Sequence, residues 1–231
     1  MPIKIYKPIG ITPVQLVEKY KKENCIKEKV SFAGRLDPMA HGEMILLVGD
    51  ECKKQDLFLG KDKIYEFEIL YGFTTDTLDI LGISRKDKKI IKNDVKELQG
   101  EYEQPYPLYS SKFIGNRKRK TPHDLVQEIR EKDKVAKKKV FIFEMDKLDE
   151  KNVSNLKLLD MILKKLELLS VEYRERFRYS KIKNKWEENL KLENIFRIER
   201  YRAKVSSGTY IRSLCERMGG IAYDINRLEV L

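Results

Sequence analysis

The sequence is poor in the side chains that form disulfides and hold metal ions. Among 231 residues it has three cysteines, Cys25, Cys52 and Cys215, and two histidines, His41 and His123. The cysteines lie far apart, are odd in number and form no CxxC pair, so the sequence supports neither a disulfide framework nor a zinc cluster. Two histidines are too few for a histidine-rich metal site. We therefore expect no metal; a cysteine–histidine nucleophile is allowed by the counts but has no local signature.

Long apolar runs are also missing. No run approaches the roughly 18 apolar residues that a helix needs to cross a bilayer. The N-terminal segment MPIKIYKPIG lacks the apolar centre of a signal peptide, and it does not have the arginine- and serine-rich pattern of a transit peptide. These absences predict a soluble intracellular protein, cytoplasmic or nuclear, with no membrane partner.

Charged residues are abundant, and positive charges are in excess. Lysine and arginine number 48 against 37 aspartates and glutamates, which gives a net charge of +11. Such a surplus favours a polyanionic partner, because each phosphate contact releases condensed counterions. Lysine-rich chains are sometimes basic only for solubility, so charge alone leaves open whether the partner is a nucleic acid.

The pattern of apolar residues predicts an α+β fold. Segment 64–73 (IYEFEILYGF) alternates apolar and charged residues, as a half-buried strand does. A helix is expected after Thr12-Pro13, where threonine caps the helix and proline takes its first position. Because strands come in groups with few βαβ alternations, we expect a mixed, mainly antiparallel sheet flanked by helices, in a single domain 1–231. Further strands are expected at residues 3–6, 44–48, 140–145 and 195–205.

Residues 154–193 are expected to be helical. Leucines recur there at three- and four-residue spacing, which is typical of a helix with one apolar stripe. Ser154 can cap the start of this helix, and the charged stretch 172–192 around Trp186 predicts a second one. We interpret 154–193 as an inserted helical hairpin. The expected stripe comprises Leu156, Leu159, Leu163 and Leu166.

The most informative stretch is VSFAGRLDPMAHGEMILLVGD, residues 30–50. At its centre Asp37 lies in a turn between Gly34 and Gly42, ahead of a buried strand. Glycines allow a ligand to approach the backbone closely, so this turn can present one carboxylate at a fixed place. Asp-Pro is also a common turn signal, and local evidence alone favours a structural turn acid.

Three further residues are candidates for a site. Tyr65 opens the alternating strand after a basic segment, where its ring either fills the core or stacks on a base. Tyr210 and Arg212 fall off the apolar stripe of the helix after Gly208, so Arg212 is expected to point away from the core. The dipole of a helix N-terminus favours anions, so a carboxylate or phosphate partner explains this arginine better. A solvated surface arginine is the alternative.

Several sequence blocks together resemble the TruB family of tRNA pseudouridine synthases. Lys7 to Gly10 (KPIG) resembles the family's KPxG motif, and Gly34 to Gly42 resembles its catalytic G-x-LDP-x-x-x-G motif. Each block is weak alone, but their order and approximate spacing agree over nearly the whole chain. The other blocks are Lys63-Ile64-Tyr65, Gly72 with Thr75-Asp76-Thr77, Gln104 with Pro105, Pro107, Tyr109 and Ser110, Ser207 to Arg212 (SGTYIR), and Arg227-Leu228.

The resemblance implies a role for each matched residue. Asp37 would be the nucleophile, Tyr65 would stack on the target base, and Tyr210 would line the pocket. Arg212 would pair with Asp37 and hold it ionised and oriented. The implied reaction isomerises a flipped-out uridine in the T-loop of tRNA to pseudouridine without a cofactor. The sequence does not decide whether Asp37 attacks the sugar or the base. Substrate contacts are expected from Lys7, Phe32, Arg35, Tyr109, Tyr210, Arg117, Lys118, Arg119 and Lys120.

Three features depart from the family pattern. Phe32 stands where the family often has a histidine that helps to flip the base, so flipping is expected to rest on stacking by Phe32 or on other groups. The family usually carries a C-terminal PUA domain, whereas this chain ends at Leu231, so RNA affinity is expected from the catalytic domain. The hairpin 154–193 is additional, and it either replaces lost RNA contacts or braces the fold.

The segment 104–131 corresponds to the family's thumb-like insertion that grips the T-arm. Its basic group, residues 117–120, is expected to contact phosphates, although a solvated charge run explains it too. Two alternatives to a monomeric, stand-alone tRNA enzyme remain at this stage. One is an RNA-binding or tRNA-folding protein with weak or no turnover, and the other is a synthase that acts on another RNA.

Overall fold

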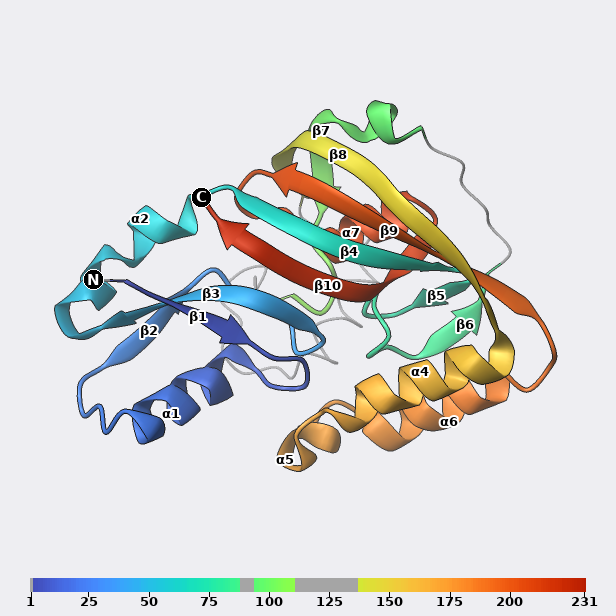
Figure 1. Cartoon of the computed structure of the whole chain (residues 1–231), viewed down its shortest axis with the longest axis horizontal. Coiled ribbons are helices and arrows are strands. Elements are labelled where there is room, and N and C mark those ends of the chain that lie inside the picture. The colour runs from blue at the N-terminus through green and yellow to red at the C-terminus, as the bar shows by residue number, and fades with distance from the viewer. Residues whose placement is uncertain (1, 88–93, 111–136) are drawn as a thin grey trace.

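The computed structural model describes residues 2–87, 94–110 and 137–231. One mixed sheet dominates this part of the chain, with strand order β1-β3-β10-β4-β9-β8-β7 and with β2 paired to β3. Its neighbouring strands are antiparallel except for β3 and β10, which run parallel (Figure 1). The predicted α+β class with a mainly antiparallel sheet is therefore confirmed.

The five strands expected from the sequence are all present, and β3 and β8 are longer than expected. The strands of the sheet are β1 (Ile3–Lys7), β2 (Val30–Ala33), β3 (Ala40–Val48), β4 (Lys63–Tyr71), β7 (Gly100–Pro105), β8 (Lys137–Ser154), β9 (Ile195–Val205) and β10 (Gly220–Val230), and a separate hairpin has β5 (Phe73–Thr75) and β6 (Ser84–Lys86). The helices are α1 (Pro13–Glu23), α2 (Gln55–Leu59), α4 (Asn155–Glu167), α5 (Val171–Arg174), α6 (Tyr179–Asn189) and α7 (Ile211–Arg217), with 3-10 turns at Gly49–Lys54 and Val95–Leu98.

Helix α1 begins at the expected residue because its end groups are satisfied. The Thr12 hydroxyl accepts a hydrogen bond from the Gln15 backbone N–H at 3.2 Å, and the Gln15 side chain accepts one from the Thr12 N–H at 2.8 Å. This reciprocal pair is a capping box, and Pro13 occupies the first helical position.

Strand β4 shows the predicted alternation. Tyr65, Phe67 and Ile69 are buried on one face, while Glu66 and Glu68 point to the other. The buried face packs with α7 in the first apolar cluster of the protein. This face of the sheet therefore carries the elements from which the candidate site is built.

A second apolar cluster lies at the other end of β4 and β9 and uses the opposite face. Leu70 and Ile198 pack there against α4 and α6, together with Trp186, which is fully buried. In Figure 1, α4 and α6 lie side by side between the end of β8 and the start of β9. The 154–193 region thus supplies a core of its own.

The apolar stripe of α4 differs from the predicted one. Leu158, Ile162 and Leu166 are buried, whereas Leu156 is 73% exposed. Leucine and isoleucine occur on several sides of this helix, so spacing alone could not fix the face that meets α6. Ser154 is the cap residue as expected but makes no side-chain cap hydrogen bond. The Asn155 side chain ties the helix start to α6, donating to the Leu190 carbonyl at 3.0 Å.

The second predicted helix is also divided. Helix α5 ends at Arg174, and α6 begins at Tyr179 after Arg178, which has a left-handed backbone conformation with φ of 57°. The thumb-like segment 104–131 is described only as far as Ser110. The basic group 117–120 lies outside the described residues.

Candidate active site

Asp37 lies in the turn between β2 and β3, and the backbone of this turn is well anchored. The Ala40 N–H donates to the Asp37 carbonyl at 3.0 Å, and the Gly10 N–H donates to the Pro38 carbonyl at 2.8 Å. Gly34 has a φ of +78°, a conformation that L side chains rarely adopt. The Asp37 side chain is 34% exposed, so a fixed turn presents a carboxylate that a ligand can reach.

Lys7 supports this turn from inside the protein. Its ammonium donates to the carbonyls of Ala40 at 2.6 Å, Pro8 at 2.9 Å and Pro38 at 3.4 Å. Burial lowers the pKa of Lys7 from 10.5 to about 7, against the opposing effect of the Asp37 charge. We expected Lys7 to contact substrate, but its side chain has no exposed surface. It therefore positions the Asp37 turn and does not reach a ligand.

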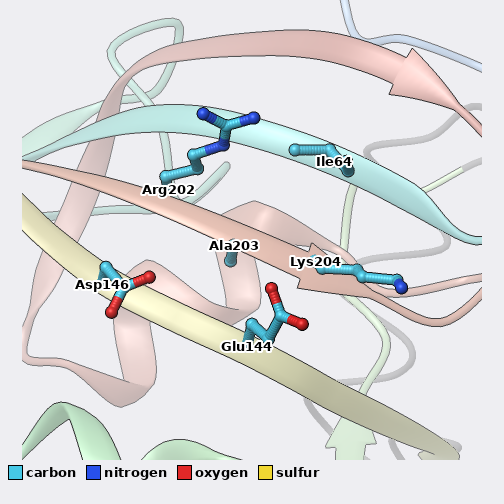
Figure 2. A pocket seen from close by; sticks show the side chains of 6 residues that line it. All are labelled: Ile64, Glu144, Asp146, Arg202, Ala203 and Lys204. Carbon is cyan, nitrogen blue, oxygen red and sulfur yellow. The ribbon is translucent and has the colours of Figure 1, made fainter.

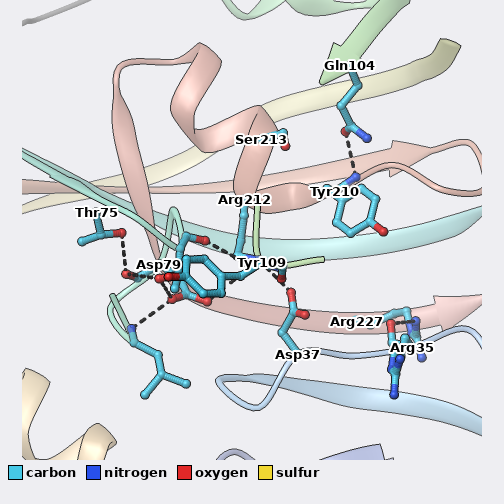
Figure 3. A network of polar contacts seen from close by, with 12 residues as sticks. Arg35, Asp37, Thr75, Asp79, Gln104, Tyr109, Tyr210, Arg212, Ser213 and Arg227 are labelled. Atoms are coloured by element: carbon cyan, nitrogen blue, oxygen red, sulfur yellow. Dashed lines mark hydrogen bonds and ion pairs between the residues drawn. The ribbon is translucent and has the colours of Figure 1, made fainter. Parts of the chain in front are cut away.

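Arg227 on β10 holds the same turn from its other side. Its guanidinium donates to the carbonyls of Glu43 at 2.7 Å, Gly34 at 3.0 Å and Arg35 at 3.4 Å. Gly42 permits this approach, because a Cβ at that position would lie 2.1 Å from the Arg227 carbonyl oxygen. Figure 3 shows Arg227 beside Arg35.

Arg212 forms the predicted ion pair with Asp37. Its Nε lies 2.8 Å from Asp37 Oδ2, and it projects from the first turn of α7 (Figure 3). The predicted outward orientation is wrong, since the side chain of Arg212 is only 4% exposed. Its other nitrogens donate to the carbonyls of Thr77 at 2.6 Å and Tyr109 at 3.3 Å. Two backbone carbonyls and the ion pair with Asp37 therefore hold the guanidinium in place.

Asp79 is a site residue that the sequence analysis missed. Its Oδ2 lies 3.9 Å from Arg212 Nε, and its Oδ1 accepts hydrogen bonds from the Thr77 hydroxyl at 2.6 Å and the Leu81 N–H at 3.0 Å. Burial raises the pKa of Asp79 from 3.8 to about 6, and Arg212 opposes this rise. The available signal was a second aspartate just after the Thr75-Asp76-Thr77 block.

The charge of Arg212 is set by burial and by two carboxylates. Burial lowers the pKa of this guanidinium, but Asp37 and Asp79 outweigh burial and raise it. Arg212 therefore stays charged. A buried cation with two carboxylates is stable only in a well-defined geometry, so its position constrains that of Asp37.

The aromatic candidates Tyr65 and Phe32 differ in burial. Tyr65 is 6% exposed and belongs to the same apolar cluster as Leu36, the residue before Asp37. Phe32 is partly buried at the edge of that cluster, and the Arg35 guanidinium lies 5.8 Å from the centroid of its ring. Phe32 and Arg35 are the more accessible of these candidates.

Tyr210 and Tyr109 come from two other segments. The Tyr210 N–H donates to the Gln104 side chain at 2.8 Å, and its ring meets that of Tyr106 edge to face at 5.8 Å. Burial and the Asp37 charge raise the pKa of Tyr210. Tyr109 contributes its carbonyl to Arg212, so both tyrosines lie at the site, as expected.

A separate shallow cavity of about 280 Å³ lies over β4, β8 and β9 (Figure 2). The sheet register sets Glu144 opposite Lys204 and Asp146 opposite Arg202. Opposite charges on neighbouring strands stabilise a sheet, which accounts for this cluster. None of the residues that line this cavity is among the predicted site residues. They are Ile64, Glu144, Asp146, Arg202, Ala203 and Lys204.

The described residues offer neither a cluster of metal ligands nor a helix that could span a membrane. In residues 2–87, 94–110 and 137–231, no group of three or more His, Cys, Asp or Glu side chains is arranged to hold a metal ion. No helix in this part of the chain is both long and apolar enough to span a bilayer.

Known proteins resemble this chain over most of its length. The sequence matches the model of the TruB family pseudouridylate synthase (N terminal domain) over residues 21–163, more than half of the chain. The tRNA pseudouridine synthase B of Caldicellulosiruptor saccharolyticus is 37% identical over 118 residues, which are 48% of this chain and 40% of that protein. That of Aquifex aeolicus is 28% identical over 229 residues, 96% of this chain and 61% of that protein. The chain thus spans less than two-thirds of these relatives' lengths.

Solved structures share the fold at low sequence identity. A chain of a Cbf5-Nop10-Gar1 complex aligns with 99% of this chain and 48% of its own length, with a TM-score of 0.57 and 18% identity. A chain of an H/ACA RNP bound to a substrate RNA containing 2'-deoxyuridine aligns with a TM-score of 0.55 and 16% identity, covering 99% of this chain and 47% of that chain. These neighbours establish the fold alone. The family match over residues 21–163, which include the Asp37 turn and both loops that reach Arg212, shows that this chain belongs to the TruB family of pseudouridylate synthases.

Proposed function

We propose that this protein is an RNA pseudouridine synthase that isomerises a flipped-out uridine in the T-loop of tRNA, with Asp37 as the nucleophile. Family membership supports the class of reaction, and the printed names of the relatives support tRNA as the substrate. The observation that carries the proposal is the 2.8 Å pair between a partly exposed Asp37 and a buried Arg212. A turn acid with a purely structural role would not need a buried counter-charge.

The proposed chemistry needs only groups that this chain supplies. Asp37 attacks the bound uridine with the carboxylate oxygen that does not face Arg212. The N1–C1′ bond breaks, the uracil turns and C5 bonds to C1′, and the bond between Asp37 and the uridine breaks, which restores the carboxylate. C5 then loses its proton and N1 gains one, so the atoms balance without a redox partner. Arg212 remains charged and keeps the second carboxylate oxygen in place.

The flipped base is proposed to bind among the aromatic side chains. We propose that the rings of Phe32, Tyr65 and Tyr210 stack on the base, and stacking on aromatic rings is worth about 1–3 kcal/mol per base. Phe32 is partly exposed, so we assign to it the flipping role of the family histidine that it replaces. Arg35 is exposed beside Phe32, and we propose that it contacts a nearby phosphate.

The test is a modification assay with matched proteins. Unmodified tRNA transcript is incubated with wild type or with Asp37→Asn, which keeps the shape of the side chain, and pseudouridine is located by carbodiimide mapping or mass spectrometry. Wild type should modify one T-loop uridine, and Asp37→Asn should modify none. A wild type that forms no pseudouridine in any RNA would contradict the proposal.

The substrate needs its own comparison. T-arm minihelices, whole tRNA and ribosomal RNA fragments are offered to the same enzyme under single-turnover conditions. We expect the minihelix to react nearly as well as whole tRNA, and ribosomal RNA to react poorly. Faster reaction of ribosomal RNA would preserve the chemistry and overturn the T-arm assignment. Size-exclusion chromatography of the active protein should give a monomer.

A further inference from the structure

The hairpin formed by α4, α5 and α6 contacts the loop that carries Asp79. Trp186 Nε1 donates to the Ile80 carbonyl at 3.0 Å, and the Asn189 side chain donates to the Ser84 carbonyl at 2.9 Å. Both donors lie in the C-terminal half of α6, and Asn189 is its last residue. Helix α6 therefore follows the loop from residue 80 to residue 84.

Arg178 extends this contact toward the candidate active site. It is the residue immediately before α6, and its left-handed conformation, with φ of 57°, is uncommon for a residue with a side chain. Such conformations persist when surrounding contacts determine them and occur often at functional sites.

The Arg178 guanidinium bridges two segments that are far apart in the sequence. Its Nη1 lies 2.7 Å from Asp76 Oδ2, and its Cζ lies 5.0 Å from the centroid of the Tyr109 ring. Only about a quarter of its side chain is exposed, so water screens the ion pair less than at an open surface. The second Asp76 oxygen accepts the Ile83 N–H at 2.8 Å, which fixes the carboxylate within its own loop.

The same two segments supply the carbonyls that orient Arg212. Thr77 follows Asp76 directly and accepts from Arg212 Nη1, and the Tyr109 carbonyl accepts from Nη2. The side chain of Arg178 therefore contacts the same two segments whose backbone carbonyls orient Arg212. The third contact of Arg212, through Nε, is the one to Asp37.

We propose that Arg178, supplied by the hairpin, is a positioning residue that fixes the Thr77 and Tyr109 carbonyls and through them the Arg212–Asp37 pair. This proposal rests on the proposed function. It gives the hairpin a role in turnover: the hairpin braces the reacting groups from outside. Misplacement of catalytic groups by about 1 Å can cost up to about a hundredfold in rate, so the loss of this bridge should be measurable.

The test compares three variants with wild type on a T-arm minihelix. Arg178→Ala should lower kcat about tenfold or more while KM changes less than threefold, because a misplaced Arg212 affects the transition state and not ground-state RNA binding. Arg178→Lys keeps the charge next to Asp76 but loses the planar group over Tyr109, so it should recover part of the rate. Asp76→Asn should resemble Arg178→Ala, and the double variant should be little worse than either single one.

Arg174→Ala is the matched control within the hairpin. Arg174 also lies over a tyrosine ring, that of Tyr179 at 4.8 Å, but its hydrogen bonds go to the carbonyls of Leu169 and Glu167 inside the hairpin. It should lower the melting temperature about as much as Arg178→Ala and leave kcat unchanged. The difference in kcat between two variants of similar stability isolates positioning from folding.

The outcomes separate this inference from the proposed function. Wild-type kcat in Arg178→Ala, with an active wild type, would overturn the inference alone. A raised KM with unchanged kcat would also overturn it, since Arg178 would then be an RNA contact. Additive losses in the double variant would break the proposed link between Arg178 and Asp76. A wild type without turnover would overturn the proposed function and the inference with it.

Discussion

Two loops meet at Arg212, and they are stabilised in different ways. The Asp37 turn is held by two buried cations, Lys7 and Arg227, which donate to its backbone carbonyls. The Asp79 loop is held by its own hydroxyl and amide groups and by contacts from α6. In the first loop the hydrogen bonds hold the backbone, and the Asp37 carboxylate stays partly exposed. In the second loop the carboxylate itself is the anchor.

This difference indicates which acid is free to react. The Asp37 side chain is 34% exposed, whereas that of Asp79 is 8% exposed and has one oxygen occupied by two donors. A nucleophile needs an accessible lone pair, and a positioning group needs a satisfied one. We therefore propose separate roles for these two aspartates on the same arginine, because their surroundings differ.

Replacing the two carboxylates in turn tests this comparison most strongly. Asp37→Asn should lower single-turnover rates by at least about a thousandfold, because it removes the proposed nucleophile. Asp79→Asn should lower them only about tenfold, because it changes just the orientation of Arg212. Rates are measured on the T-arm minihelix with both proteins at saturating concentration. Equal losses would mean that exposure does not distinguish the two acids.

Removing the shared arginine affects both loops at once. Arg212→Ala should lower activity by orders of magnitude while the protein stays folded. We expect a stability loss of about 2–3 kcal/mol, below the roughly 3–5 of a broken, fully buried pair, because Asp37 is partly exposed. Urea unfolding and turnover are measured together, with Arg212→Lys as the variant that keeps the charge. Retained activity in Arg212→Ala would refute the role of the pair.

The two loops should respond to pH in opposite directions. The pKa of Lys7 falls from 10.5 to about 7 on folding, so the unfolded chain binds more protons between these values and stability rises with pH there. The pKa of Asp79 rises from 3.8 to about 6, so the folded chain binds more protons and stability falls as pH rises through that window. Urea unfolding of wild type is compared with Lys7→Met and Asp79→Asn at each pH. Lys7→Met should lose only the pH dependence of stability between about 7 and 10.5. Asp79→Asn should lose only that between 3.8 and about 6.

The basic group at residues 117–120 should act on RNA binding alone. Alanine at Lys118, Arg119 and Lys120 should weaken RNA binding and reduce the slope of log affinity against log salt by about 2, at roughly 0.7 per phosphate contact. The kcat at saturating RNA should not change, since these residues are proposed to contact phosphates and not the reacting base. An unchanged salt slope would identify the segment as a solvated charge run.

Local patterns predicted much of the fold and one central pair. The capping box of α1 and the alternation in β4 depend on neighbouring residues, so the sequence was enough to find them. The Asp37–Arg212 pair was found because each residue sits in a recognisable block. Burial of Arg212 was not foreseen, because it depends on Thr77 and Tyr109, which only the folded chain brings to it.

The other differences between prediction and structure also arise from contacts between residues that are far apart in the sequence. Lys7 was expected to contact substrate because it lies in the KPIG block, but its side chain is buried and three carbonyls compensate for its burial. The apolar face of α4 was misassigned because leucine periodicity does not say where Trp186 and α6 will pack. Asp79 was overlooked because an aspartate in a loop gives no local sign of the arginine that will face it.

The position of β10 determines when the Asp37 turn can be completed during synthesis. This last strand lies in the interior of the sheet, between β3 and β4, and pairs Ile225 to Arg227 with Ala40 to Gly42. Arg227 therefore reaches the turn across almost 200 residues of sequence. Contacts of such separation form late, since the intervening chain must be ordered first. A growing chain that already contains Asp37 but not yet β10 lacks the Arg227 clamp, so the turn is completed only after β10 has paired with β3.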